Sequence, residues 1–568
     1  MKKRFLLSLP VAAVLVLVVF WALAQPAPAP LASIFPAGAL VYLEAKDLSS
    51  LLADWNASVE KRAWLESANY QVFSRSRLFL KLTEAQAEFA TAAGVPVDYA
   101  LLGPVAGTNS ALSIYDIGSL EFLYITRLTS ARAMDTALWK ARSSYQTRNA
   151  GGVTYYVKED KASHRLAAFA HTSDMLLLAT KEELIAGALE LLARQSRPAI
   201  VSEKWFADGV QAAPPGPRDL RLVYNLERLT RTPHFRSYWV QRNTGALREF
   251  SAGLADLERA GGELRERRVL LRGTPAADLS AVEAAAGELL ALVPDDAGLY
   301  RVWARPAAAQ AQRWIEEKLF AASVPAGPQS NQAPVVLRTP DAGGEQDLET
   351  RIDEPPLGDD RNARAFAALR ERLSAARLDA MLEVSSARLA PDRVFVRPQS
   401  AIVLLASDAW AAPAVRDALT ASVSNLWTSA GLGAGWRAGP AGVEQLDGLV
   451  KLAIAVDGRR LVIGDSVELV NAILARRNRA AAAGAVYAAG WRHARELSNF
   501  ERLTRLIDFP QIPSAPAEAE QPAAREPMFF SENMASLGRA LERVQSATIA
   551  AHDSGLVVRE SVVYRFGP

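Results

Sequence analysis

Two long stretches of this 568-residue chain repeat one another. The segment HRLAAFAHTSDMLLLATKEELIAGALELLARQ, from His164, aligns without a gap with VKLAIAVDGRRLVIGDSVELVNAILARR, from Val450. Ala168 matches Ala453, and Leu189 matches Leu474, at one constant offset. Copies of one ancestral unit are expected to fold alike, so this repeat constrains the architecture more than any short motif.

The first copy predicts a β-hairpin followed by an amphipathic helix. Apolar residues 166–171 and 175–179 read as two short strands around a Thr-Ser-Asp turn. Thr180 and Glu183 match the S/T-x-x-E capping box that opens a helix. We therefore expect the helix to start directly after Thr180.

The second copy predicts the same elements with different turn and cap residues. Asp457-Gly458 is a strong hairpin-turn dipeptide. Asp465 is expected to be the helix N-cap, with Glu468 at the third helical position. Each copy is thus expected to be a hairpin followed by a capped helix.

Further segments recur in the same order along the chain. Residues 35–42 (FPAGALVY) resemble residues 293–300 (VPDDAGLY), and residues 261–272 resemble residues 554–565. NLERLTRTPHF from Asn225 matches NFERLTRLIDF from Asn499. Several matches in one order indicate a tandem duplication.

The ERLTR motif is best explained as a structural helix start. Asn225 and Asn499 are suited to cap a helix. Glu227 and Arg231 stand at the i,i+4 spacing that supports a helix, and Leu229 is expected to face inward. An arginine pair that faces a ligand is the alternative.

The predicted fold class is α+β, with two tandem related domains. Each is expected to be a mainly antiparallel sheet with packed helices, because successive hairpins alternate with helices. An N-terminal hydrophobic helix precedes them. The expected boundaries are 1–24 for a signal peptide or signal anchor, 25–30 for a Pro/Ala spacer, 31–273 for the first repeat, 274–290 for a linker helix, and 291–566 for the second repeat, with disordered insertions at 323–362 and 512–527.

The N-terminus predicts export from the cytoplasm. Lys2, Lys3 and Arg4 precede an uncharged apolar run over residues 5–24, which ends in Ala-Leu-Ala. The small-x-small ending favours cleavage as a signal peptide, whereas the length of the run approaches that of a membrane-spanning helix. In either case we expect a periplasmic or extracytoplasmic body, anchored in the inner membrane if residues 5–24 are retained.

The balance of charges argues against a nucleic-acid partner. The net charge is +2, whereas duplex-binding proteins usually carry a basic surplus or stripe. The chain has no cysteine, which excludes disulfides and thiol chemistry. The expected partners are the membrane, through an uncleaved N-terminal segment, and a protein of the envelope.

Motifs for catalysis are missing from the sequence. Walker A, H-E-x-x-H and G-x-S-x-G patterns do not occur. Ser58 and Lys61 match S-x-x-K without its partner elements. The five histidines are scattered, and His164 and His171 are expected on opposite faces of a strand. No catalytic, cofactor-binding or metal-ligating residue is therefore assigned, no cofactor is expected, and the binding residues stay unknown.

Trp55, Trp64, Trp303 and Trp314 have two explanations. They could line an apolar groove, but large aromatic residues more often fill a core.

FPAGALVYLEAKDLSSLLADW and MLLLATKEELIAGALELL, together with the export signal, resemble an uncharacterised family of bacterial envelope proteins, known only as a domain of unknown function. The resemblance implies an extracytoplasmic setting and supplies no catalytic residues. We expect a membrane-associated binding or scaffolding protein rather than an enzyme. The alternative is an envelope hydrolase or transferase whose site lies at the interface of the two repeats.

Overall fold

The computed structural model describes residues 30–567 except 67–69, 71–72, 76, 98, 234–246, 321–365, 390–395, 427–434, 440–441, 448–451, 494 and 497–542. These residues form two compact units. The first takes its described residues from the ranges Met1–Ala53, Lys81–Gln211 and Leu220–Arg248, and the second takes them from Asp54–Leu80, Ala212–Asp219 and Glu249–Pro568. Each unit is described by itself.

Both units combine helices with antiparallel strands, which confirms the predicted α+β class. Hydrogen bonding across the first unit follows the strand order β8 (Leu220–Tyr224), β1 (Val41–Lys46), β2 (Asn109–Asp116), β3 (Glu121–Arg127), β7 (Met175–Ala179), β6 (Leu166–His171), β5 (Val153–Glu159) and β4 (Gln146–Ala150).

Helices of the first unit connect and cover these strands. They are η1 (Leu31–Ile34), α2 (Leu48–Ala57), α5 (Arg77–Ala93), α6 (Tyr99–Val105), α7 (Ser130–Asp135), α8 (Ala137–Lys140), η2 (Arg142–Ser144), α9 (Glu182–Leu192), η3 (Ile200–Ser202), α10 (Lys204–Ala212) and α11 (Leu226–Leu229). The bounds of α2, α5 and α10 reach a few residues beyond those assigned to this unit.

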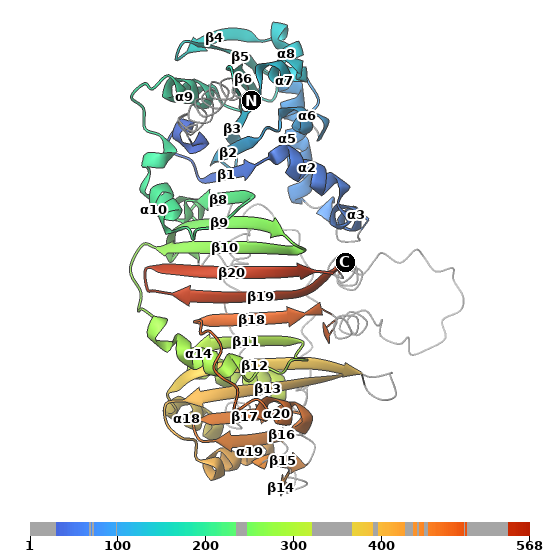
Figure 1. The fold of residues 1–568 in the computed structure, drawn as a ribbon, viewed down its shortest axis with the longest axis vertical. Coiled ribbons are helices and arrows are strands. Elements are labelled where there is room, and N and C mark those ends of the chain that lie inside the picture. Colours follow the sequence, from blue (N-terminus) through green and yellow to red (C-terminus); the bar gives the residue numbers. More distant parts are fainter. Residues whose placement is uncertain are drawn as a thin grey trace, which may run out of the picture. The chain divides into compact units, whose positions relative to one another are not determined.

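The second unit has a longer run of paired strands, whose middle part is seen in Figure 1. Its order is β9 (Phe250–Ala260), β10 (Glu263–Arg272), β20 (Val557–Phe566), β19 (Val544–Asp553), β18 (Tyr487–Arg492), β11 (Leu299–Ala304), β12 (Leu378–Leu389), β13 (Val396–Ala406), β17 (Arg460–Gly464), β16 (Leu452–Asp457), β15 (Glu444–Asp447) and β14 (Gly435–Ala438).

The helices of the second unit lie mostly between the strands in sequence. They are α3 (Val59–Leu65), η4 (Ser280–Val282), α14 (Glu283–Leu290), α15 (Ala308–Trp314), the π-helix η5 (Ile315–Leu319), α18 (Ala367–Ala375), α19 (Ala412–Leu426) and α20 (Val467–Leu474).

The strand order of the first unit recurs inside the second. The run from β18 to β14 pairs in the same sequence as the run from β8 to β4, with β1 matched by β11 and β7 by β17. β9 and β10, which the sequence places in the first repeat, lie in the second unit, because β10 pairs along its length with β20.

The repeated hairpins form where the sequence predicts them. β6 and β7 have the predicted bounds, and Gly458 takes a φ of 57° in the two-residue turn between Asp457 and Arg460. A positive φ is easily adopted by glycine, which explains the Asp-Gly dipeptide there.

Both predicted helix caps are wrong. In α9 the N-cap is Lys181, which makes no side-chain cap bond. The Thr180 hydroxyl is not available as a cap, because it accepts the Phe122 N–H of β3 and donates to the Leu120 carbonyl. In α20 the cap is Ser466, whose hydroxyl accepts the Leu469 N–H at 3.3 Å. Asp465 instead bonds to Ser400 on β13.

Two hydrophobic clusters cover opposite faces of the second unit's strands. Ile402 and Leu404 of β13 belong to one cluster with α15, α18 and α19, whereas Ala401 and Val403 belong to the other with α14 and α20. Alternate strand residues point to opposite faces, which explains the division.

Several predicted segments lie outside the described residues: the hydrophobic run 5–24, most of the spacer 25–30, and the insertions 323–362 and 512–527. Within the segment 274–290, helix begins only at Ser280. Among the described helices, none combines the length and apolar character that crossing a bilayer requires.

Candidate functional site

The first unit contains an apolar cavity of about 280 Å³. It lies between helix α5 and strands β3, β6 and β7, with α8 at one side. Its lining consists of Leu82, Ala85, Gln86, Phe89, Ala93, Val97, Leu120, Phe122, Leu138, Leu166, Ala167, Ala168, Phe169, Leu178, Ala179 and Thr180.

Helix α5 contributes one face to this lining. Its five lining residues, between Leu82 and Ala93, recur at spacings of three and four, so they fall on one side of the helix. Leu82 is 47% exposed although it lines the cavity. The cavity is therefore open to solvent at this end of α5.

The floor of the cavity is formed by strand residues of β6. Ala167 contributes a small side chain on the same face as the buried ring of Phe169. In the second unit the residue equivalent to Ala167, at the offset of the repeat, is Leu452, which is buried in the cluster around α15, α18 and α19. The equivalents of Phe169 and Leu178 are Ile454 and Ile463, which belong to that same cluster. In the first unit Phe169 belongs to a smaller cluster with Ala93, Leu138 and Tyr145, and the cavity lies beside it.

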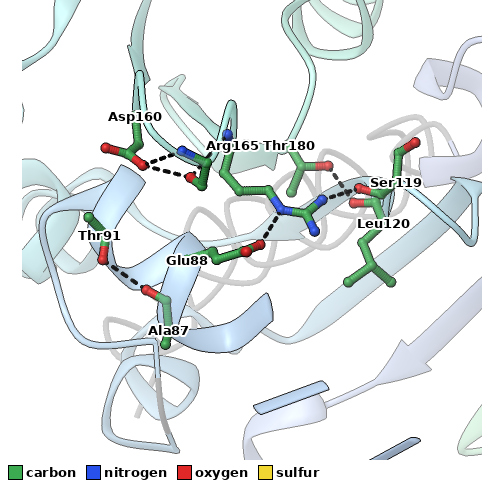
Figure 2. Close-up of polar contacts among 9 residues, drawn as sticks. Ala87, Glu88, Thr91, Ser119, Leu120, Asp160, Arg165 and Thr180 are labelled. Atoms are coloured by element: carbon green, nitrogen blue, oxygen red, sulfur yellow. Dashed lines mark hydrogen bonds and ion pairs between the residues drawn. The ribbon is translucent and has the colours of Figure 1, made fainter. Parts of the chain in front are cut away.

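A charged pair lies at the rim of the cavity, next to its lining residues (Figure 2). Arg165 Nε donates to Glu88 Oε2 at 2.7 Å, and Arg165 Nη1 donates to the Ser119 carbonyl at 2.7 Å. The guanidinium carbon lies 5.1 Å from the ring centre of Phe89, which lines the cavity. The side chains of Arg165 and Glu88 are 23% and 32% exposed, so both reach solvent.

Neighbouring polar side chains are committed to the backbone. Thr180 donates its hydroxyl to the Leu120 carbonyl and accepts the Phe122 N–H, each at 2.9 Å. The Gln86 amide donates to the Val97 carbonyl. These bonds fix the two polar side chains of the wall. The other lining residues are apolar.

The turn before β6 positions Arg165. Asp160 Oδ2 accepts the backbone N–H of Ser163 at 2.9 Å and its hydroxyl at 2.7 Å. The Ser163 side-chain and backbone bonds hold the pKa of Asp160 below its usual range. Asp160 is therefore ionised at neutral pH, where it accepts both bonds.

The residues singled out in the sequence do not gather at this cavity, apart from Thr180 in its wall. Ser58 caps α3 by accepting the Lys61 N–H, and the Lys61 ammonium donates to Asn56. His164 has a φ of 56° in the turn, whereas the His171 ring packs 5.1 Å from that of Trp139. Within the described part of the chain, no three His, Asp or Glu side chains come together in a way that could hold a metal ion.

The other described histidines have local roles. His493 packs on Trp491, and His552 Nδ1 lies 2.9 Å from Glu283. His234 lies outside the described residues.

The first ERLTR motif is a helix start, as predicted. Asn225 Oδ1 accepts the Arg228 N–H at 3.1 Å, Arg231 pairs with Glu227 at 3.1 Å, and Leu229 is buried. The second copy, from Asn499, lies outside the described residues. Of the four tryptophans, Trp314 is buried in a core, Trp303 packs against it, and Trp55 is 42% exposed.

Two buried carboxyl groups of the second unit have raised pKa values. Burial raises the pKa of Asp465 to about 6, although the backbone N–H groups of Ser400 and Asp465 act in the opposite direction. Burial also raises the pKa of Glu383, against the effect of Arg301. Asp465 bonds to Ser400, and Glu383 pairs with Arg301. Burial within the fold accounts for both shifts.

The sequence did not single out the cavity. The helical spacing of the α5 residues was a usable signal, but the same spacing also describes a filled core. Arg165 and Glu88 are 77 residues apart and carry no motif.

No family model and no curated relative match the chain. Crystal structures of TP0453 in forms IV, I and III are similar to part of it, each at 13% identity and a TM-score of 0.24. They cover 43%, 45% and 46% of this chain, and 81%, 83% and 88% of their own. At this level of similarity nothing about fold or function is transferred from TP0453.

Proposed function

We propose that the protein is an extracytoplasmic, membrane-associated binding protein whose first unit holds a small apolar ligand. The cavity of about 280 Å³ beneath α5 carries the proposal. Its volume is near the lower end of the range for ligand pockets, about 300–1,000 Å³. Dry apolar cavities of about 150 Å³ already bind molecules such as benzene.

The corresponding face of the second unit shows the kind of contacts that a ligand would supply. Leu452, Ile454 and Ile463 pack there in the cluster around α15, α18 and α19. A bound apolar ligand would provide the lining of the first unit with similar contacts.

We further propose that the two units descend from one duplicated domain. The repeated segments and the common strand order from β8 to β4 and from β18 to β14 support this history. In this account one copy kept a filled face and the other kept a binding cavity.

The membrane setting is proposed from the N-terminal sequence and from exposed apolar side chains. Within the described part of Asp54–Leu80, Trp55, Val59, Leu65 and Leu80 are all exposed. Contiguous exposed apolar patches are typical of membrane and protein interaction sites, and we propose that these residues contribute to one. Fractionation of the native host, with N-terminal sequencing of the mature chain, tests the setting: recovery of the body in the cytosol would contradict it.

Ligand binding is tested by titrating the delipidated full chain with aminoanthracene, which fluoresces more strongly in an apolar site. We expect a saturable increase with one site per chain. A linear, non-saturating response, the same as that of an unrelated protein, would contradict the proposed function.

A further inference from the structure

We propose that the ligand is a single-chain amphiphile with a carboxylate head, held by the guanidinium of Arg165 while its chain enters the cavity. This inference rests on the proposed function, because it names the class of ligand for the same cavity.

Arg165 has hydrogen-bonding capacity to spare. A guanidinium carries five N–H groups. Its bonds to Glu88 and Ser119 use Nε and Nη1, and the structure gives Nη2 no partner among the described residues. The edge formed by Nη1 and Nη2 can therefore still take a carboxylate with two parallel hydrogen bonds.

The position of Arg165 suits a head group. It directly precedes Leu166 in the lining, and its guanidinium lies 5.1 Å from the ring of Phe89. Figure 2 shows the side chain extending toward Glu88 on α5 and toward the Ser119–Leu120 backbone. A carboxylate bound here leaves its aliphatic chain next to the apolar wall.

Glu88 is the internal competitor for this head group. Its carboxylate neutralises Arg165, yet at 32% exposure it can turn toward solvent. A partly exposed ion pair contributes little stability, so exchanging Glu88 for a ligand carboxylate costs little. A cationic ligand would instead meet Arg165, and Asp160 nearby is already bonded to Ser163.

The size of the cavity limits the chain. A volume of about 280 Å³ lies near the lower end of the range for ligand pockets, which favours a medium-length chain over a long one. Decanoate is therefore a suitable test ligand, and decanol is its uncharged counterpart.

The test is calorimetric titration of the delipidated full chain with decanoate, below its micelle concentration, and with decanol, below its solubility limit. We expect the wild type to bind decanoate at least tenfold more tightly than decanol. Arg165→Gln should weaken decanoate binding at least tenfold and leave decanol binding unchanged. Glu88→Gln should strengthen decanoate binding, because the competing carboxylate is gone.

Arg165→Lys keeps the charge but loses the planar edge, so it should bind decanoate more weakly than the wild type and more tightly than Arg165→Gln. Retained binding of aminoanthracene shows that a variant is folded. Equal affinities for decanoate and decanol, or an unchanged decanoate affinity in Arg165→Gln, would overturn this inference and leave the proposed function standing. Failure of aminoanthracene, decanol and decanoate alike would overturn both.

Discussion

Thr180 and Asp465 occupy equivalent positions and make the same two contacts with a neighbouring strand. The Thr180 N–H donates to the Phe122 carbonyl at 3.1 Å, and its hydroxyl accepts the Phe122 N–H at 2.9 Å. The Asp465 N–H donates to the Ser400 carbonyl at 3.0 Å, and its carboxylate accepts the Ser400 N–H at 2.8 Å. The position needs a hydrogen-bond acceptor, but it does not need a charge.

Asp465→Asn is therefore expected to stabilise the protein at neutral and higher pH. Burial raises the folded-state pKa of Asp465 from 3.8 to about 6. The folded state then binds more protons than the unfolded state, so the contribution of this group to stability falls as pH rises from about 4 to about 6. Asparagine keeps the acceptor oxygen and removes this dependence.

Denaturant unfolding at low and at neutral pH checks this prediction. The difference in unfolding free energy between Asp465→Asn and the wild type should grow in favour of the variant from pH 4 to pH 7. A difference that stays constant over this range would contradict it.

Arg272 and Asp553 form a bidentate ion pair in the second unit, between β10 and β19, with both N–O distances at 2.7 Å. Burial acts to raise the pKa of Asp553, but the bonds from Arg272 and the Gly555 N–H outweigh it and hold the pKa below its usual value. The stability from this carboxylate is therefore lost as pH falls through the acidic range.

Asp553→Ala should lower the free energy of unfolding by about 3–5 kcal/mol, because it leaves the Arg272 charge buried without its partner. The double change Arg272→Met, Asp553→Leu should recover much of that loss. The exposed Glu227–Arg231 pair is the control, and Glu227→Ala should cost less than about 1 kcal/mol. If Asp553→Ala lowers the free energy of unfolding as little as Glu227→Ala does, the buried pair has no structural role.

Gly107 and Gly103 should respond in opposite ways to the same substitution. A Cβ at Gly107 would lie 2.0 Å from the Arg127 carbonyl oxygen, whereas a Cβ at Gly103 would meet nothing within 4 Å. Gly107→Ala should lower the melting temperature by an amount equivalent to about 1–3 kcal/mol. Gly103→Ala, within α6, should raise stability by up to about 1 kcal/mol. Differential scanning calorimetry measures both, and an unchanged melting temperature in Gly107→Ala would refute the close contact.

Local patterns predicted the local elements of this fold. The strands Leu166–His171 and Met175–Ala179 have the expected bounds, and Asn225 caps its helix as expected. Hairpin strands are specified largely by neighbouring residues, so they can be predicted from sequence.

The misplaced caps and the cavity depend on contacts that sequence does not display. Thr180 resembles a helix cap, but its hydroxyl is used by Phe122, 58 residues away. Lining residues such as Leu82 on α5 and Ala167 on β6 recur at the same helix and strand spacings as the residues of a filled core. Whether a face is filled depends on which helices pack there, and that is a tertiary property.

The most direct test of apolar-ligand binding is to fill the cavity with the residue that the second unit carries. Ala167→Leu introduces the side chain found at Leu452. Ala87→Leu makes the same chemical change at an exposed position of α5 outside the lining, and it is the matched control. In aminoanthracene titrations, Ala167→Leu should bind at least tenfold more weakly than the wild type while Ala87→Leu binds equally well. Unchanged binding in a folded Ala167→Leu variant would show that the cavity is not the ligand site.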